Sequence, residues 1–435
     1  MNAPLADPLA IEPLTRPVDA NVVVPGSKSI TNRALVAAAL AAGESRLDGV
    51  LLADDTDAMI DSLGRLGVGL DVDRAAHRIT VVGTGGHLAH GPLDLHARLS
   101  GTTARFLAPL VAIGPGPYRL DAGAPMRRRS MGPVIDALRA LGAEVREEGE
   151  PGHLPFVVAG GGLAGGEVVL PGDISSQFLS GLLLAAPAMA GGLRATVSTA
   201  LVSRPYVELT AAVMAAFGVA VAQVDDRTFA VAAGRYRACR YAVEPDASAA
   251  SYLFAAAAIC GGRVRVAGLG RSSQQGDLAF VEVLAAMGAE VTVGDDATEV
   301  VVHGALHGGE FDLGDLSDTA QTLAAVAVFA TGPTRVTGIG FIRGKETDRI
   351  AAVVAELRRC GIDADEEPDG FVVRPGAPRP AVIETYHDHR MAMSFALLGL
   401  RAPGIAIADP GCVAKTFPGY FAALDQLRSP PGGGR

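Results

Sequence analysis

The sequence lacks the features of a membrane, secreted or disulfide-stapled protein. No apolar run reaches the roughly 18 residues that a membrane-spanning helix needs, and the longest candidate, Leu179–Ala190, contains Gly181 and Pro187. The N-terminus carries acids and prolines where a signal peptide needs a basic start and an apolar stretch. The four cysteines form no CxxC pair and no even framework. We therefore expect a protein of the reducing cytoplasm.

Positive charge is also scarce, and lysine is nearly absent. The chain has 37 Lys and Arg against 47 Asp and Glu, a net charge of −10, which disfavours nucleic acid and anionic membranes as partners. Only three lysines occur: Lys28, Lys345 and Lys415. Lysine is a compact point charge, whereas arginine is a planar fork. The three lysines are either surface remnants or members of a site for small anions.

A repeat runs through the 435 residues. Five times, a helix with apolar residues three apart meets a glycine and then a short apolar strand, at intervals of 70–76 residues. An Ala-rich segment, apolar on all sides and therefore expected to be a buried helix, precedes each copy. A sixth helix is predicted at Phe421–Leu427. The glycines are Gly67, Gly142, Gly218, Gly288 and Gly361.

Six such units predict an α/β protein of two similar domains, each built from three repeated β/α units with buried Ala-rich helices. We expect an N-terminal domain over 25–244 and a C-terminal domain over 1–24 plus 245–435. The last unit lacks its closing strand, so the N-terminal segment should complete that sheet. The chain would cross twice, near 24–26 and 243–246, forming a two-strand hinge. Ligands favour such interdomain clefts.

Several stretches of the N-terminal half place glycines, hydroxyls or arginines where a helix should begin. Backbone N–H groups at a helix start attract phosphate or carboxylate, although the same residues can simply cap a helix or form a solvated basic face. The GxxxxGK[ST] phosphate loop is absent. The stretches are Val24–Arg33, Ser100–Arg105, Pro125–Gly132, Gly172–Phe178 and Ser203–Tyr206.

The C-terminal half has four comparable features. Asp318 begins an Ala-rich helix as either a cap or a base. In Arg343–Arg349, Lys345 and Arg349 are four apart and should share a helix face. His387–Arg390 contains an HxH pair, but no third ligand cluster accompanies it, so we expect no metal. Ala414–Pro418 is the equivalent loop of the sixth unit.

If the units are arranged alike, their helix starts converge and aim partial positive charges into one cleft. Arginines and lysines of both halves would join it, which implies a substrate pair with several negative charges. These cations are Lys28, Arg33, Arg129, Lys345, Arg349, Arg390 and Lys415.

Taken in order, the stretches PGSKSITNR, SGTTAR, DISSQF, SRPY, GKETDR, DHRMAM and AKTFP resemble those of the 5-enolpyruvylshikimate-3-phosphate synthases. They span residues 24–420. The resemblance implies transfer of the enolpyruvyl group of phosphoenolpyruvate to the 5-hydroxyl of shikimate 3-phosphate, with release of phosphate. It also implies a monomer that needs these two small molecules, no metal and no organic cofactor.

The resemblance assigns residues to each substrate, with shikimate 3-phosphate on the 25–244 side. Asp318 matches the carboxylate that accepts the 5-hydroxyl proton, Glu346 matches the group that handles the methylene proton, and Lys28 and His389 complete the catalytic set. The shikimate 3-phosphate residues would be Lys28, Ser29, Arg33, Ser175, Ser176, Gln177, Ser203, Tyr206, Asp318 and Lys345. The phosphoenolpyruvate residues would be Lys28, Gly101, Thr102, Arg129, Gln177, Arg349, Arg390 and Lys415.

Two positions depart from the family pattern. Leu99 and Phe341 stand where many members have an asparagine that contacts a substrate, so those polar contacts must be absent or replaced. Gly101 is where side-chain bulk affects the herbicide glyphosate in this family, and a glycine suggests room for it.

Two other functions compete with this one. The sister enzyme that modifies a UDP-amino sugar usually carries a reactive cysteine in the loop equivalent to 124–130, which has none here. A hinged anion-binding protein without catalysis would explain the cations but not the need for Asp318 and Glu346.

Overall fold

The computed structural model describes residues 5–428. The chain divides into two compact units, which we call the N-terminal unit (Gly26–Glu244) and the C-terminal unit (Met1–Pro25 with Pro245–Arg435). The boundaries expected from the sequence differ from these only at Pro25. The chain passes between the units at 25–26 and at 244–245, and the two segments around these positions are hydrogen-bonded to each other. Ser27 N–H donates to Glu244 O and Asp246 N–H donates to Pro25 O, both at 2.8 Å.

The N-terminal unit contains three four-stranded sheets, ordered β14-β3-β5-β4, β6-β7-β9-β8 and β10-β11-β13-β12. In each sheet the first two strands are parallel and the other pairs are antiparallel. The strands are β3 (Ala42–Asp48), β4 (Gly69–Asp73), β5 (Arg78–Thr84), β6 (Leu93–His96), β7 (Tyr118–Asp121), β8 (Val145–Glu147), β9 (Phe156–Val158), β10 (Gly166–Leu170), β11 (Leu193–Val197), β12 (Ala222–Gln223), β13 (Thr228–Val231) and β14 (Arg240–Ala242).

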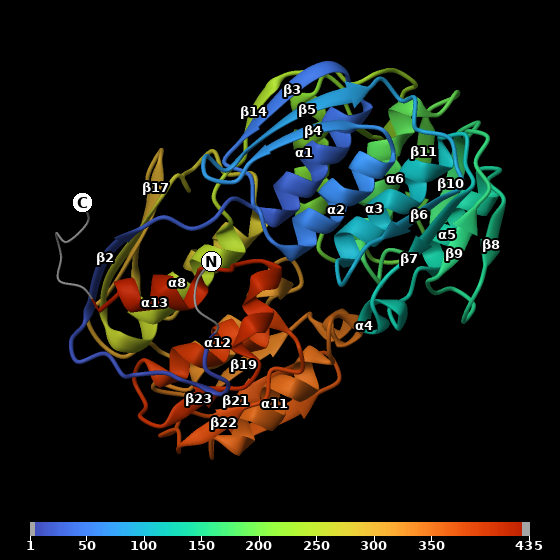
Figure 1. The fold of residues 1–435 in the computed structure, drawn as a ribbon. Coiled ribbons are helices and arrows are strands. Elements are labelled where there is room, and N and C mark those ends of the chain that lie inside the picture. Colours follow the sequence, from blue (N-terminus) through green and yellow to red (C-terminus); the bar gives the residue numbers. More distant parts are fainter. Residues whose placement is uncertain (1–4, 429–435) are drawn as a thin grey trace. The chain divides into compact units, whose positions relative to one another are not determined.

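Two kinds of helix accompany these sheets. The inner helices α1 (Lys28–Leu40), α3 (Gly101–Ala112) and α6 (Ser176–Ala185) are buried along almost their whole length and run together in Figure 1. The outer helices, α2 (Asp54–Arg65), α5 (Gly132–Ala140) and α7 (Pro205–Ala216), are buried along one face. Short turns complete the unit: α4 (Ala124–Arg127) and the 3₁₀ turn η1 (Ala186–Ala188).

The C-terminal unit repeats this plan with sheets β16-β17-β15-β2, β18-β19-β21-β20 and the three-stranded β1-β23-β22. Its strands are β1 (Leu9–Ala10), β2 (Val18–Val22), β15 (Gly262–Ala267), β16 (Glu290–Val293), β17 (Ala297–Val302), β18 (Glu310–Asp312), β19 (Thr334–Thr337), β20 (Ala364–Glu367), β21 (Gly370–Val373), β22 (Ala381–Ile383) and β23 (Ile405–Ile407). The inner helices of the C-terminal unit are α8 (Ala247–Cys260), α10 (Ala320–Ala327) and α12 (His389–Gly399). Its outer helices are α9 (Phe280–Ala286), α11 (Arg349–Arg359) and α13 (Tyr420–Gln426). Its 3₁₀ turns are η2 (Gly276–Ala279), η3 (Ser317–Thr319), η4 (Gly340–Gly344) and η5 (Pro410–Lys415).

The N-terminal segment supplies strands to two sheets of the C-terminal unit. Strand β1 pairs antiparallel with β23 of the sixth repeat, as the missing strand of that repeat led us to expect. Strand β2 pairs in parallel with β15 of the fourth repeat. This second pairing was not foreseen, because a parallel partner leaves no local signal in the sequence.

The predicted α/β class and the helix-ending glycines are confirmed. Gly67, Gly142, Gly218, Gly288 and Gly361 follow α2, α5, α7, α9 and α11, with φ between 76° and 109°. Residues with a side chain rarely adopt this left-handed backbone conformation, so glycine is favoured at the position where each of these helices ends. The sixth helix begins at Tyr420, one residue before its predicted start.

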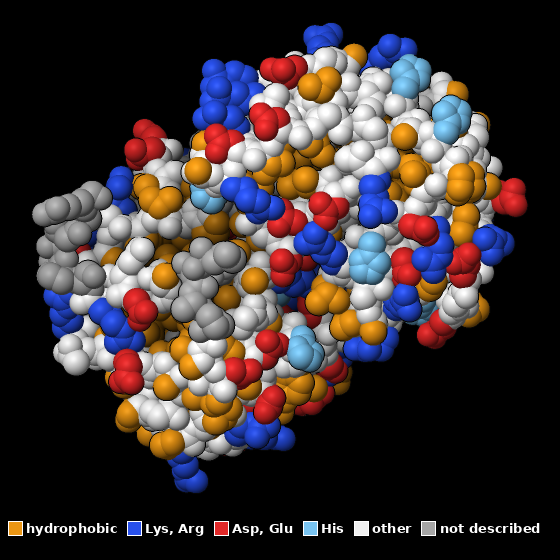
Figure 2. Space-filling view, viewed as in Figure 1, with side chains coloured by type: hydrophobic (Ala, Val, Ile, Leu, Met, Phe, Trp, Pro, Cys, Tyr) orange, Lys and Arg blue, Asp and Glu red, His pale blue; other side chains and the backbone are white. Residues whose placement is uncertain are grey.

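The surface carries both signs of charge. On the face shown in Figure 2, acidic and basic side chains are interspersed. Within residues 5–428, no helix has both the length and the apolar character needed to cross a membrane.

Small residues let the inner helices approach one another closely. A Cβ atom built on Gly181 of α6 would lie 2.5 Å from the backbone oxygen of Arg105 in α3. Backbone atoms cannot move away as a flexible side chain can, so the two helices need a glycine here.

We therefore expect Gly181→Ala to lower the free energy of unfolding by about 2 kcal/mol or more, because the added methyl overpacks the α3–α6 contact. Urea unfolding monitored by circular dichroism measures this. Gly234→Ala is the matched control, since its added Cβ meets nothing within 4 Å. Equal midpoints for the two variants would contradict the close-packing argument.

Candidate active site

Serine residues cap the three inner helices of the N-terminal unit. Ser27 Oγ accepts from Ile30 N at 3.4 Å, Ser100 Oγ accepts from Thr103 N at 3.2 Å, and Ser175 Oγ accepts from Gln177 N at 3.3 Å. The capping explanation of these motifs is therefore correct. It does not exclude a site, because each cap leaves polar residues on the first helical turn.

Arg105 joins two of these helix starts. Its Nη1 donates to Gln177 Oε1 at 2.9 Å and to Ser175 Oγ at 3.5 Å. Gln177 Nε2 in turn donates to Thr102 Oγ1 at 3.2 Å. Sequence reasoning quoted Arg105 within SGTTAR but did not single it out. Its position four residues after Gly101, on the same helix face, was the available signal.

The run of three arginines separates into different roles. Arg127 is exposed and pairs with the buried Asp121, and Arg128 is exposed. Arg129 is buried, and its Nη1 would lie 2.8 Å from a Cβ atom built on Gly101. The Arg129 guanidinium can therefore occupy this position only because residue 101 has no side chain.

Lys28 and Arg33 lie on α1 and differ in accessibility. Lys28 is partly exposed and its Nζ lies 3.6 Å from Asp55 Oδ2. The buried Arg33 guanidinium donates to Thr210 Oγ1 at 2.8 Å, Ser29 O at 2.9 Å and Tyr206 O at 3.0 Å. Burial lowers the pKa of Arg33 to about 10. Arg33 thus braces the segments that carry Ser29 and Tyr206, while its direct contact with a substrate stays a prediction.

The other N-terminal candidates lie at neighbouring helix starts. Ser176 begins α6 and is buried, while Ser203 precedes α7 in a left-handed conformation, with φ of 52°.

In the C-terminal unit, Arg349 is the centre of a charged cluster. It is the first residue of α11 and only 2% exposed. Its Nε donates to Asp388 Oδ2 at 2.8 Å, its Nη1 to Asp318 Oδ1 at 3.1 Å, and its Nη2 to Glu346 Oε2 at 2.8 Å. Burial alone would lower the pKa of Arg349, but the three carboxylates outweigh it and raise that pKa above its ordinary value.

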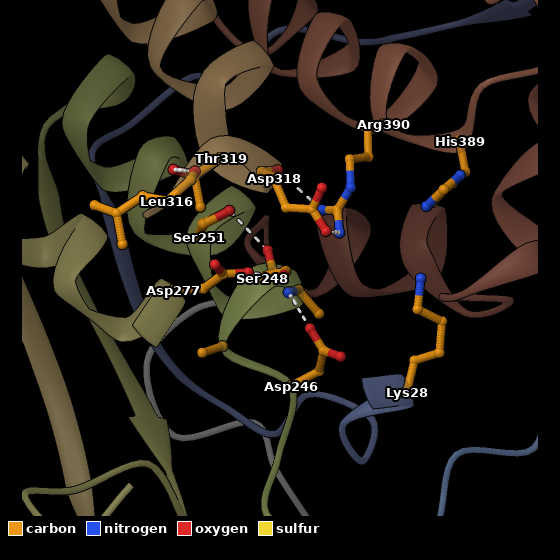
Figure 3. Close-up of polar contacts among 12 residues, drawn as sticks. Lys28, Asp246, Ser248, Ser251, Asp277, Leu316, Asp318, Thr319, His389 and Arg390 are labelled. Atoms are coloured by element: carbon orange, nitrogen blue, oxygen red, sulfur yellow. Dashed lines mark hydrogen bonds and ion pairs between the residues drawn. The ribbon is translucent and has the colours of Figure 1, made fainter. Parts of the chain in front are cut away.

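Arg390 and Lys415 complete the cluster. Arg390 Nη2 donates to Asp318 Oδ2 at 2.5 Å, and Arg390 Nη1 donates to Asp318 O at 3.0 Å; Figure 3 shows the two side chains facing one another. Lys415 Nζ donates to Glu346 Oε1 at 2.6 Å. Three buried cations are thus held by three carboxylates, of which sequence reasoning named Asp318 and Glu346 but missed Asp388. Asp388 lies between the two histidines of the His387–Arg390 stretch, whose HxH pair was considered above only as a metal motif.

Asp318 does not cap the Ala-rich helix. It lies in η3, and α10 begins at Ala320 after Thr319, without a side-chain cap. Its carboxylate oxygens instead face Arg349 and Arg390.

The expectation that Lys345 and Arg349 share a helix face is wrong. Helix α11 begins only at Arg349 because Asp348 accepts from Ala351 N at 3.0 Å and caps it there. Lys345 follows η4, and its Nζ lies 5.6 Å from the centre of the Phe341 ring. Phe341, one of the two departures from the family pattern, thus contacts Lys345 through its aromatic face.

His389 is buried at the start of α12, with Nδ1 3.5 Å from Asp388 Oδ1. Leu99, the second departure, is 40% exposed.

Comparison with known proteins identifies the family of this chain. The profile of the family described as EPSP synthase (3-phosphoshikimate 1-carboxyvinyltransferase) matches residues 14–424. The chain belongs to the EPSP synthase family.

Curated relatives match this family member over nearly their whole length. The 3-phosphoshikimate 1-carboxyvinyltransferase of Nostoc punctiforme is 49% identical over 422 residues, covering 97% of this chain and 99% of the relative. That of Shewanella amazonensis is 42% identical over 429 residues, covering 98% and 100%. The EPSP synthase structure from Acinetobacter baumannii superposes with a TM-score of 0.81 at 27% identity, covering 96% and 97%.

A further buried carboxyl, Asp277 of η2, lies beside Ser248 at the start of α8 (Figure 3). Burial raises the pKa of Asp277 to about 6, and the charge of Asp318 acts in the same direction, while the hydrogen bond from Ser248 opposes them. Folded Asp277 therefore holds its proton at pH values where the unfolded carboxyl, near its ordinary pKa of 3.8, has lost it.

The native state consequently binds more protons between about pH 4 and 6, so the contribution of Asp277 to the unfolding free energy falls as pH rises through that window. Asp277→Asn removes this fall. We expect the variant to gain up to about 3 kcal/mol over the parent between pH 4 and 7. Urea midpoints across this range, with Asp226→Asn as the exposed control, measure the gain. A pH-independent difference would contradict the buried titration.

Proposed function

We propose that this protein transfers the enolpyruvyl group of phosphoenolpyruvate to the 5-hydroxyl of shikimate 3-phosphate and releases phosphate. Membership of the EPSP synthase family over residues 14–424 carries the proposal. The clusters of cations, hydroxyls and carboxylates in the two units support it, because both substrates are polyanions and the reaction also needs proton transfer.

Phosphoenolpyruvate would bind through cations of the charged cluster and through the helix starts of the N-terminal unit. Arg349, Arg390 and Lys415 present guanidinium and ammonium groups, which suit phosphate and carboxylate. The proposed contacts are Lys28, Gly101, Thr102, Arg129, Gln177, Arg349, Arg390 and Lys415.

Shikimate 3-phosphate would bind through hydroxyl and amide donors at the starts of the inner helices. Ser175 and Ser176 begin α6, and the partial positive charge of its N-terminus favours a phosphate. The proposed contacts are Lys28, Ser29, Arg33, Ser175, Ser176, Gln177, Ser203, Tyr206, Asp318 and Lys345.

The carboxylates of the charged cluster supply the proton chemistry. When anionic substrate groups take Arg349, Arg390 and Lys415 as partners, Asp318 and Glu346 lose their present hydrogen-bond donors. Asp318 can then accept the proton of the 5-hydroxyl, and Glu346 can exchange a proton with the methylene carbon. His389 would assist this exchange, and Lys28 would neutralise charge on both ligands.

The reaction is an addition followed by an elimination. A proton adds to the methylene carbon of phosphoenolpyruvate, and the 5-oxygen, after giving its proton to Asp318, forms a bond to the neighbouring C2. In the tetrahedral intermediate the bond from C2 to the phosphate oxygen then breaks, and the methyl group returns a proton. Phosphate leaves and takes up the proton that Asp318 received from the 5-hydroxyl, and the double bond is restored.

We also propose that the protein works in the cytoplasm as a monomer with small-molecule substrates and no nucleic acid. The four cysteines support a reducing compartment, since each is a free thiol.

A phosphate-release assay with phosphoenolpyruvate and either shikimate 3-phosphate or a UDP-amino sugar tests the function. We expect release only with shikimate 3-phosphate. Release only with the sugar nucleotide would establish the sister reaction, and binding of both anions without turnover would establish a non-catalytic protein.

Asp318→Asn keeps the side-chain shape and one of the two acceptor oxygens that face Arg349 and Arg390, but it removes the base. We expect kcat to fall by roughly 10²- to 10⁴-fold, with the dissociation constant of shikimate 3-phosphate changed little. Stopped assays and titration calorimetry measure the two quantities. Unaltered turnover would remove Asp318 from the mechanism.

Gly101→Ala brings a Cβ atom to 2.8 Å from Arg129 Nη1 and must displace that guanidinium. We expect KM for phosphoenolpyruvate to rise by about tenfold, the equivalent of about 1.4 kcal/mol, while KM for shikimate 3-phosphate stays within about twofold. Initial-rate measurements separate the two constants. A rise of similar size for both substrates would show that the substitution disturbs more than Arg129.

A further inference from the structure

Glu356 is a fully buried carboxylate on α11 that takes no part in the proposed chemistry. Its exposed fraction is 0%. Burying a carboxylate costs free energy unless hydrogen bonds compensate for the lost water. The donors around Glu356 therefore indicate its role.

Two of these donors come from the segment immediately before α12. Glu356 Oε2 accepts from Glu384 N at 3.0 Å, and Oε1 accepts from the Tyr386 hydroxyl at 2.7 Å. Arg359, one turn along α11, supplies the others, with Nε at 2.8 Å and Nη2 at 3.2 Å. The Glu356 carboxylate therefore ties α11 to the segment 384–386.

The backbone of this segment is strained. Tyr386 and His387 both have φ of 55°, in the left-handed region that side chains disfavour. Two consecutive non-glycine residues hold this conformation only where surrounding contacts enforce it. The bonds from Glu384 and Tyr386 to Glu356 are such contacts.

Asp388 follows the strained turn directly and links it to the charged cluster. It is fully buried, accepts from Arg390 N at 2.9 Å as the cap of α12, and accepts from Arg349 Nε at 2.8 Å. Arg349 and Glu356 lie seven residues apart on α11, about two helical turns, and thus face the same side. The segment 384–388 is therefore fixed to α11 at two points.

We propose that Glu356 is a positioning residue for phosphoenolpyruvate. By holding the Tyr386–His387 turn, it fixes Asp388, which in turn orients the guanidinium of Arg349. This inference rests on the proposed function, in which Arg349 binds that substrate. It predicts that Glu356 sets the affinity for one substrate without touching it.

Glu356→Gln tests the proposal, because glutamine keeps the shape but turns one acceptor oxygen into a donor that faces other donors. We expect KM for phosphoenolpyruvate to rise by about tenfold or more, with kcat and KM for shikimate 3-phosphate within about twofold. Glu384→Gln is the matched control, since its exposed side chain is outside this contact and only its backbone donates to Glu356. It should match the parent.

Tyr386→Phe is the second variant, and it tests the proposal even if Glu356→Gln does not fold. It removes one hydrogen bond and keeps the charge of Glu356, so KM for phosphoenolpyruvate should rise by a smaller factor, roughly three- to fivefold. An unchanged KM in Tyr386→Phe, or equal losses for both substrates in Glu356→Gln, would overturn the proposal, because a merely structural role gives no split between the substrates.

A measurement without substrate separates this inference from the proposed function. Amide hydrogen exchange over 384–392 should be faster in Glu356→Gln than in the parent and unaltered in Glu384→Gln. Unchanged exchange in Glu356→Gln would refute the role of Glu356 in holding the turn. An inactive parent in the phosphate-release assay would instead refute the proposed function and leave the exchange result standing.

Discussion

Helices that are buried on every side constrain both units of this protein. Such a helix satisfies its backbone internally except at its ends, where the first N–H groups must find partners inside the protein. Ser27, Ser100 and Ser175 supply them in the N-terminal unit, and Asp246 and Asp388 do so in the C-terminal unit. The polar residues of the candidate site therefore gather where the packing of apolar helices already requires polar groups.

The second constraint is charge balance. Buried guanidinium groups such as those of Arg349 and Arg390 need carboxylates nearby, because desolvation of an unpaired charge costs more than folding can tolerate. Asp388 serves Arg349 permanently through its role as a helix cap. In the proposed function, anionic substrate groups instead replace Asp318 and Glu346 as partners of the cations. One charged cluster thus balances its buried charges internally and, in the proposed function, also binds anions and supplies groups for proton transfer.

Buried charged groups also position neighbouring residues. Arg105 orients Gln177, Arg33 braces Ser29 and Tyr206, and Glu356 holds the turn before Asp388. Each uses a buried charged or polar group to fix a neighbour. This explains why an uncommon conformation, such as the left-handed pair Tyr386–His387, can persist beside a site that needs accurate geometry.

The sequence by itself determined the α/β class, the repeat, the buried Ala-rich helices and the glycines that end the outer helices, because these follow from local periodicity and backbone preference. It also named most candidate site residues through motifs. Only the tertiary structure decided the partners: Arg349 meets Asp388 across 39 positions and Arg390 meets Asp318 across 72. Asp388, Glu356 and Asp277 were missed for this reason, whereas Lys345 was wrongly placed on a helix because the local cap at Asp348 starts α11 only at Arg349. Burial and pairing depend on which distant segments pack together, and no spacing along one segment of the chain encodes that.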